Sequence, residues 1–134
     1  MRGALLSLAL CTATWASRAE PSAADYAFVA ARSVSIVSRG DPDVVFVLPQ
    51  TLSQAARASI AELRHVVSRP EDVPAPRMPH STRSYFVVDK FTIGSTEAVF
   101  EGQQGPGPCG AHYSIPFKLT GGQWEQGVPV IAVC

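Results

Sequence analysis

The chain has 134 residues, of which 46% are hydrophobic and 16% charged, with eleven Lys and Arg against eleven Asp and Glu. This length suits one compact domain and is too short for two. The balanced charge excludes a protein that binds nucleic acid through a strongly basic surface.

The first nineteen residues have the pattern of a secretory signal peptide. A positively charged start, Met1–Gly3, precedes an apolar run over Ala4–Ala13 that is far too short to span a membrane. Ser17-Arg18-Ala19 supplies small residues at the −3 and −1 positions, so we expect cleavage after Ala19; Thr14-Trp15-Ala16 is the second choice. The sequence therefore predicts a bacterial protein that is exported, either to the periplasm or out of the cell.

Two other interpretations of the N-terminus stay open. The segment could be a buried helix flanked by Arg2 and Arg18. Leu8–Cys11 also resembles the lipobox of bacterial lipoproteins, which would attach a lipid to Cys11, although Leu10 stands where that motif has a small residue.

Cleavage after Ala19 would leave nine Lys and Arg against eleven Asp and Glu, a net charge of −2, together with two cysteines. An even number of cysteines in an oxidising compartment is typical of a disulfide. We therefore expect Cys109 and Cys134 to form one disulfide bond.

The last twenty-six residues predict a β-hairpin that supports this bond. If Gly121-Gly122 forms a two-residue turn, the numbers of opposed residues add up to 243, and Cys109 lies opposite Cys134. Lys118 then lies opposite Glu125, an opposite-charge pair that stabilises a sheet. Apolar residues share the other face of the hairpin.

Two prolines disturb this hairpin. Pro116 and Pro129 fall where the backbone nitrogen should donate a ladder hydrogen bond, so we expect a bulge or a broken rung near them. A one-residue bulge without compensation would move the cysteines out of opposition.

Two helices are expected before the strands. Ser22 and Asp25 form a capping box at the start of the first helix and Gly40 ends it, although the β-branched Val34–Val37 could end in an extended form. Val44–Leu48 is either a strand or a buried connector. The second helix should lie on the sheet through an apolar stripe made of Leu52, Ala56, Ile60, Leu63 and Val67.

The second half of the chain predicts strands. Arg69–Arg83 contains four prolines and should be an extended, polyproline-like connector. Strands are expected over Tyr85–Ile93 and Thr96–Gly102, before a loop and the terminal hairpin. The predicted fold class is α+β: a helix packed on a curved four-stranded antiparallel meander, with an additional N-terminal helix, in a single domain over residues 20–134.

Asp89, His112 and Tyr113 are the candidates for catalysis. The expected turn at residues 94 and 95 would place Asp89 opposite Phe100, on an apolar face where burial would raise the pKa of a carboxyl group. The alternative leaves Asp89 on an edge strand, pointing to water. His112 can act as an acid or a base near neutral pH, and it lies opposite Ile131 in the 243 register, although a surface histidine is the simpler interpretation.

Other chemistry has little support. His65, His80 and His112 are scattered, without cysteines or acidic residues at metal-ligand spacing, so we expect no metal site and no cofactor. The sequence has no nucleophile elbow and no phosphate-binding loop. Trp124, Tyr113 and Phe117 could line a ligand pocket, although such a group more often forms core.

The order of helix, proline-bearing connector and antiparallel strands ends in a hairpin of the form Tyr113…Leu119-Thr120-Gly121-Gly122-Gln123-Trp124. Over residues 50–134 this resembles small secreted bacterial domains of the cystatin-like or nuclear-transport-factor-2-like architecture. The resemblance implies a cone-shaped pocket between sheet and helix, which some members use for catalysis and many for binding or assembly. Cystatin inhibitors carry a Gln-x-Val-x-Gly loop, which Gln126–Val130 matches at the first and third places only.

We therefore expect a non-catalytic binding or interaction module whose partner is a protein or a small molecule. The alternative is a small-molecule enzyme that uses Asp89 as a base, with His112 or Tyr113 as its helper. Protease inhibition is a third and weaker hypothesis.

Overall fold

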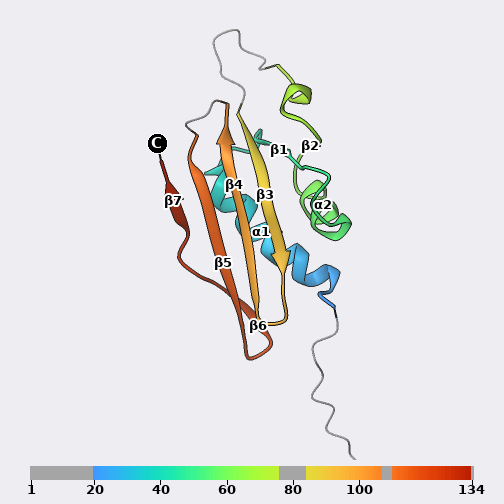
Figure 1. The fold of residues 1–134 in the computed structure, drawn as a ribbon, viewed down its shortest axis with the longest axis vertical. Coiled ribbons are helices and arrows are strands. Elements are labelled where there is room, and N and C mark those ends of the chain that lie inside the picture. Colours follow the sequence, from blue (N-terminus) through green and yellow to red (C-terminus); the bar gives the residue numbers. More distant parts are fainter. Residues whose placement is uncertain (1–19, 76–83, 107–109, 134) are drawn as a thin grey trace, which may run out of the picture.

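The computed structural model describes residues 20–75, 84–106 and 110–133, which form two α-helices and a mixed sheet of seven strands (Figure 1). The strand order is β2-β1-β3-β4-β5-β6, with β7 also pairing with β5. The predicted α+β class is confirmed, and the four-stranded antiparallel meander is wrong. The elements are α1 (Ala23–Ser38), β1 (Val45–Val47), α2 (Gln54–Ala61), β2 (Val66–Val67), the 3₁₀ helix η1 (Pro70–Asp72), β3 (Tyr85–Ile93), β4 (Glu97–Gly105), β5 (His112–Thr120), β6 (Gln123–Gln126) and β7 (Val130–Ala132).

The meander was wrong because two short parallel strands extend the sheet beyond β3. β1 pairs in parallel with both β3 and β2. The backbone N–H groups of Phe46 and Leu48 donate to the carbonyls of His65 and Val67, at 3.0 and 2.9 Å. The apolar run over Val44–Leu48 therefore contains a strand, Val45–Val47, which is the first of the two predicted alternatives.

Helix α1 begins and ends where the local sequence predicts. The Ser22 hydroxyl accepts from the backbone N–H of Asp25, and the Asp25 carboxylate accepts from the backbone N–H of Ser22, which completes the capping box. At the other end Arg39 and Gly40 both have positive φ, 49° and 79°, so the helix cannot continue. Val34–Val37 stays helical, and the alternative of an extended end is wrong.

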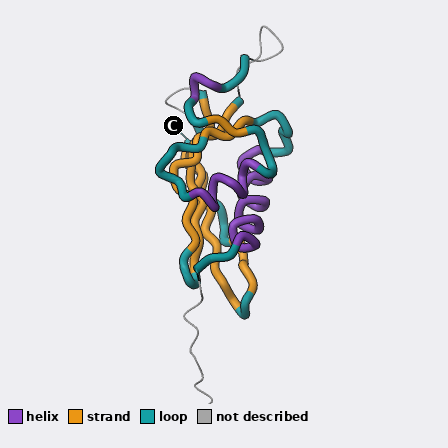
Figure 2. The backbone as a smooth tube through the Cα atoms, turned by 90° about the vertical axis from the view of Figure 1, so that its right-hand side faces the viewer, coloured by secondary structure: helices purple, strands orange, loops and turns teal. Residues whose placement is uncertain are grey.

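The helix that covers the sheet is α1, and not the second helix as predicted. α1 packs against β3, β4, β5 and β6, while α2 packs on α1 beside the sheet (Figure 2). α2 begins after its N-cap Ser53, as expected, but ends at Ala61. Leu63 is 44% exposed, so it does not belong to the buried stripe, and Val67 lies in β2. The predicted helix over Leu52–Val67 was too long because its last residues pair with β1.

The proline-rich connector is not uniformly extended. Pro70–Asp72 forms a 3₁₀ turn, and the next residue, Val73, is buried. Residues 76–83 lie outside the described part of the chain.

The core between the sheet and the helices contains a group of aromatic rings in contact with one another. Phe86 stacks on Phe100 with ring centroids 6.0 Å apart, and its other neighbours are Phe46 and Tyr113. Gly102 makes this packing possible, because a Cβ there would collide with the ring of Phe86. All four aromatic residues are at least 97% buried.

The terminal hairpin follows the predicted register for four pairs and then changes it. Thr120–Gln123, Leu119–Trp124, Lys118–Glu125 and Phe117–Gln126 are opposed, as the 243 register requires. Between Gly127 and Val130 the chain contains one extra residue, so β7 pairs with β5 in a register of 244. The shifted pairs are Ser114–Val130, Tyr113–Ile131 and His112–Ala132.

The predicted bulge is thus confirmed, and the predicted register beyond it is wrong. Cys109 and Cys134 lie outside the described residues. Their disulfide stays a prediction, which now rests on the cysteine count because the described register no longer supports it.

Candidate functional site

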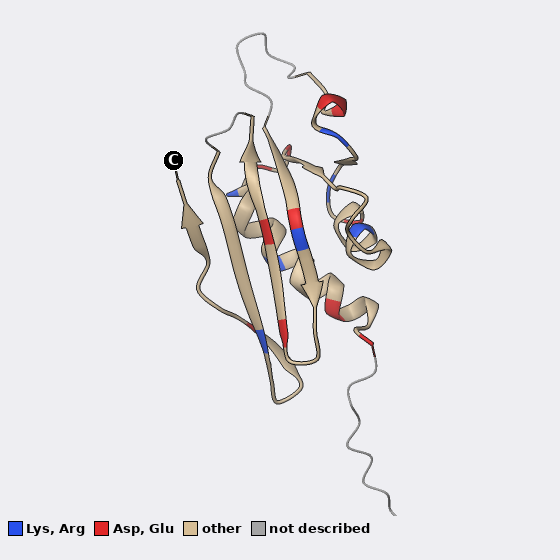
Figure 3. Ribbon diagram, viewed as in Figure 1, with Lys and Arg blue, Asp and Glu red and all other residues tan. Residues whose placement is uncertain are grey.

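The candidate site is the sheet face that points away from α1, called here the open face. Alternate residues of β3, β4 and β5 form this face, and Figure 3 shows that charged residues lie along these three strands. Within the described part of the chain no helix packs on it. On β4 and β5 its residues are Glu97, Val99, Glu101, Gln103, His112, Ser114, Pro116 and Lys118, none of which is buried.

Asp89 reaches this face through a β-bulge. The turn after β3 is two residues longer than predicted, which places Phe91, and not Asp89, opposite Phe100. The register shifts between Val88 and Lys90, so Asp89 is the extra residue of β3. The expected Asp89–Phe100 pairing is therefore wrong. The bulge turns Asp89 outwards, where its side chain is 45% exposed.

The structure brings Asp89 and His112 together. Nε2 of His112 lies 3.9 Å from Oδ2 of Asp89, although the two residues belong to strands separated by β4. Partial burial raises the pKa of the Asp89 carboxyl above its ordinary value; nearby Glu101 raises it further, while His112 lowers it. His112 lies opposite Ala132, and not opposite Ile131 as the 243 register predicted.

Ser114 is not hydrogen-bonded as an activated serine nucleophile would be. The hydroxyl of Ser114 donates to Oε1 of Glu101 at 3.0 Å, so its hydrogen bond goes to a carboxylate and not to a histidine. Tyr113, the third candidate, lies on the opposite face of β5, where it is 97% buried and packs edge-on against Phe86. The structure therefore joins two of the three candidates and separates the third.

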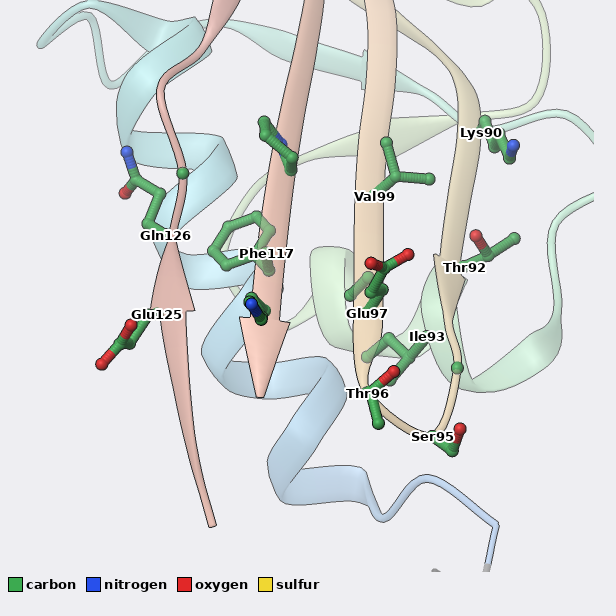
Figure 4. A pocket seen from close by; sticks show the side chains of 15 residues that line it. Lys90, Thr92, Ile93, Ser95, Thr96, Glu97, Val99, Phe117, Glu125 and Gln126 are labelled. Carbon is green, nitrogen blue, oxygen red and sulfur yellow. The ribbon is translucent and has the colours of Figure 1, made fainter. Parts of the chain in front are cut away.

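Two hollows flank the bulge. The larger, of about 850 Å³, lies on the open face near the turn between β3 and β4, and Figure 4 shows its side chains. Its charges are balanced, because two lysines, Lys90 and Lys118, and two acids, Glu97 and Glu125, line it. Lys118 lies between the two acids on the neighbouring strands. The smaller, of about 370 Å³, lies between β3 and the start of α2 and is lined in part by Asp89.

The edge strand β7 borders the open face and has a different chemistry. Val130 and Ile131 of this strand are 64% and 50% exposed, and Val128 before it and Val133 after it are 82% and 74% exposed. Figure 3 shows no charge along this strand. Soluble proteins usually protect an exposed sheet edge with charges, so a charge-free apolar edge is unusual.

The sequence prediction missed this edge because it placed Val128 and Val130 on the apolar side of the terminal hairpin. The available signal was the run from Gly127 to Val133, which contains no charged residue.

Comparisons with known proteins assign no family to this chain. It matches no protein-family model, no curated protein and no solved structure. In the described ranges, no helix is long and apolar enough to cross a membrane. The same residues contain no group of three or more His, Cys, Asp or Glu side chains arranged to hold a metal ion.

Proposed function

We propose that this protein is an exported interaction module without catalytic activity, which binds a protein partner through β7 and the adjoining part of the open face. The observation that carries this proposal is the exposure of Val130 and Ile131 on the edge strand β7 and of Val133 directly after it. Contiguous exposed apolar surface on a small soluble domain is typical of a protein-binding site.

The surroundings of β7 suit a protein interface. Ala132 and Val130 lie opposite His112 and Ser114, so the apolar edge continues directly into polar groups. Apolar centres with hydrogen-bonding neighbours are the usual composition of such interfaces. An unpaired strand edge can also accept an added strand, whose backbone supplies affinity.

Export is part of the proposal and is supported by the N-terminal sequence pattern. We predict that the mature chain begins at Glu20 and contains a Cys109–Cys134 disulfide. Mass spectrometry of the exported protein tests the first statement, and a thiol assay on the unfolded protein tests the second. Two free thiols per chain would contradict the disulfide.

Photo-crosslinking tests the binding function. A photoreactive amino acid replaces Val130 in the exporting cell, and a matched variant carries it at Gln123, which is exposed on β6. We expect a discrete crosslinked product from position 130 only. The product should disappear when Ile131→Lys is added and persist with Val128→Lys, because Val128 lies outside the strand pairing. Equal products from positions 130 and 123 would contradict the proposal.

A small-molecule enzyme is the second candidate, favoured by the 3.9 Å separation of Asp89 and His112. Both side chains are nearly half exposed, which leaves them in contact with water and weakens this candidate. A fragment screen followed by amide chemical shifts tests it. Shifts grouped around Asp89 and His112 would support the enzyme, whereas shifts confined to β7 would support the interaction module.

A further inference from the structure

We infer that the partner of β7 is a second copy of this chain, and that two β7 strands pair antiparallel about a two-fold axis at Ile131. This inference rests on the proposed function and specifies its partner. Within the described residues, β7 has a neighbouring strand on one side only, namely β5.

The backbone of β7 has its free hydrogen-bonding groups at Ile131. Leu119 donates to Thr96 and Ala111 accepts from Gln104, so the odd-numbered residues of β5 bond towards β4. Its even-numbered residues, including His112 and Ser114, therefore face β7. Their opposite residues, Ala132 and Val130, use their backbone groups towards β5. The N–H and C=O of Ile131 consequently point to the outer edge.

An antiparallel pair centred on Ile131 satisfies these groups. Each Ile131 would donate its N–H to the carbonyl of Ile131 in the second copy and accept in return. Two residues further along, the N–H of Val133 would reach the carbonyl of Pro129 in the second copy. Proline lacks an N–H but keeps its carbonyl, so Pro129 is compatible with this ladder and cannot lengthen it.

The side chains of β7 are complementary to themselves in this arrangement. Val130 would lie opposite Ala132 of the second copy on the open face. On the other face the two Ile131 side chains would meet above a hollow of about 630 Å³, which Ile36, Tyr113 and Val133 line in part. Because Gly127–Val133 has no charge, the two paired strands themselves bring no like charges together. Arg39 also lines this hollow, so each copy holds one positive charge near the contact.

The symmetry also limits the assembly. A two-fold contact uses the same edge of both copies, so it closes at a dimer. The paired segment, Pro129–Val133, has far fewer residues than the roughly 20–30 a side of a standard stable interface. We therefore expect a weak dimer whose population depends on protein concentration.

Sedimentation of the exported protein from micromolar to millimolar concentration measures this dimer. Ile131→Lys and Ile131→Glu should each weaken it by roughly tenfold or more, because like charges would then meet across the axis. An equimolar mixture of the two variants should restore dimers, since the charges are now opposite. Val128→Lys adds the same charge outside the ladder and should leave the dimer unchanged.

Amide hydrogen exchange of the unmodified protein gives a readout that needs no variant. Raising the concentration should slow exchange at Ile131 and Val133, whereas Ala132 and Val130 already face β5. Monomers at every concentration, no effect of Ile131→Lys, or no recovery in the mixture would overturn the dimer. If the protein is monomeric and position 130 still crosslinks a different protein, the dimer fails and the proposed function stands.

Discussion

The two faces of the central sheet are made by alternating residues of the same strands, and they have opposite characters. On β5, the alternate residues Tyr113, Ile115 and Phe117 are buried beneath α1. Two residues of the other alternation, His112 and Ser114, are exposed and half-buried. The covered face contains aromatic rings in mutual contact. The open face contains acidic residues, lysines and a histidine, whose side chains stay partly or fully exposed to water.

This difference separates, within the same strands, the residues that stabilise the fold from the exposed residues. Burial of apolar area supplies most of the free energy of folding, so the covered face determines whether the domain folds. Exposed ion pairs contribute little to stability, so Asp89 and His112 can change with small effect on folding. The edge strand β7 is the exception, because it is both apolar and exposed. The proposed partner would bury its side chains.

Phe100→Ala should cause the largest loss of stability. Phe100 is fully buried and contacts both Phe86 and Phe91. Truncation removes these apolar contacts and leaves a cavity, so the free energy of unfolding should fall by about 3–5 kcal/mol. Gln103→Ala, an exposed change on the same strand, should cost within about 0.5 kcal/mol. Urea unfolding measures both. Similar decreases in the free energy of unfolding for the two variants would contradict the distinction between the two faces.

Gly102→Ala should cause the next largest loss. The new methyl group would overlap the ring of Phe86 and the carbonyl of Val87, at a cost of about 1–3 kcal/mol for overpacking. Its effect should shrink in part when Phe86→Leu is present, because the smaller side chain removes the overlap with the ring and leaves that with the Val87 carbonyl. A double-mutant cycle by thermal unfolding measures this coupling, and additive effects would contradict it.

Trp124→Phe tests the attachment of β6 to α1. Nε1 of Trp124 donates to Oδ1 of Asp25 at 2.9 Å, and Phe keeps an aromatic ring while removing this donor. A hydrogen bond to a charged group is worth about 1.5 kcal/mol or more. We expect a loss of that size in chemical unfolding. An unchanged free energy of unfolding would mean that solvent replaces the bond at no cost.

Asp89→Asn should have the smallest effect, and its sign depends on pH. The pKa of Asp89 is raised in the folded state, so the protonated carboxyl favours folding at low pH and this contribution is lost as pH rises through the raised pKa. At neutral pH the amide should therefore stabilise the domain by roughly a few tenths of a kcal/mol after screening by water. Unfolding measured at several pH values checks this, and His112→Gln serves as the control for the loss of the pair. A stabilisation that is greatest at low pH would contradict the assignment.

The sequence alone determined the elements that depend on neighbouring residues. Ser22, Asp25 and Gly40 set both ends of α1 because capping and positive φ act within a few residues. The limits of β3 and the first four rungs of the terminal hairpin followed in the same way from strand propensity and from the turn at Gly121-Gly122. The α+β class came from the order of these elements.

Only the tertiary structure decided the features that require contacts between distant residues. α1 covers the sheet, and β2 takes the residues expected at the end of α2, because parallel pairing with β1 satisfies their backbone groups. The bulge at Asp89 and the extra residue before Val130 each move the following side chains relative to the neighbouring strand. Because strand side chains alternate between the two faces, one inserted residue changes which side chains lie next to each other across the strands. The local sequence does not predict at which position the insertion occurs. For this reason the proximity of Asp89 and His112 and the outward backbone of Ile131 emerged only from the assembled sheet.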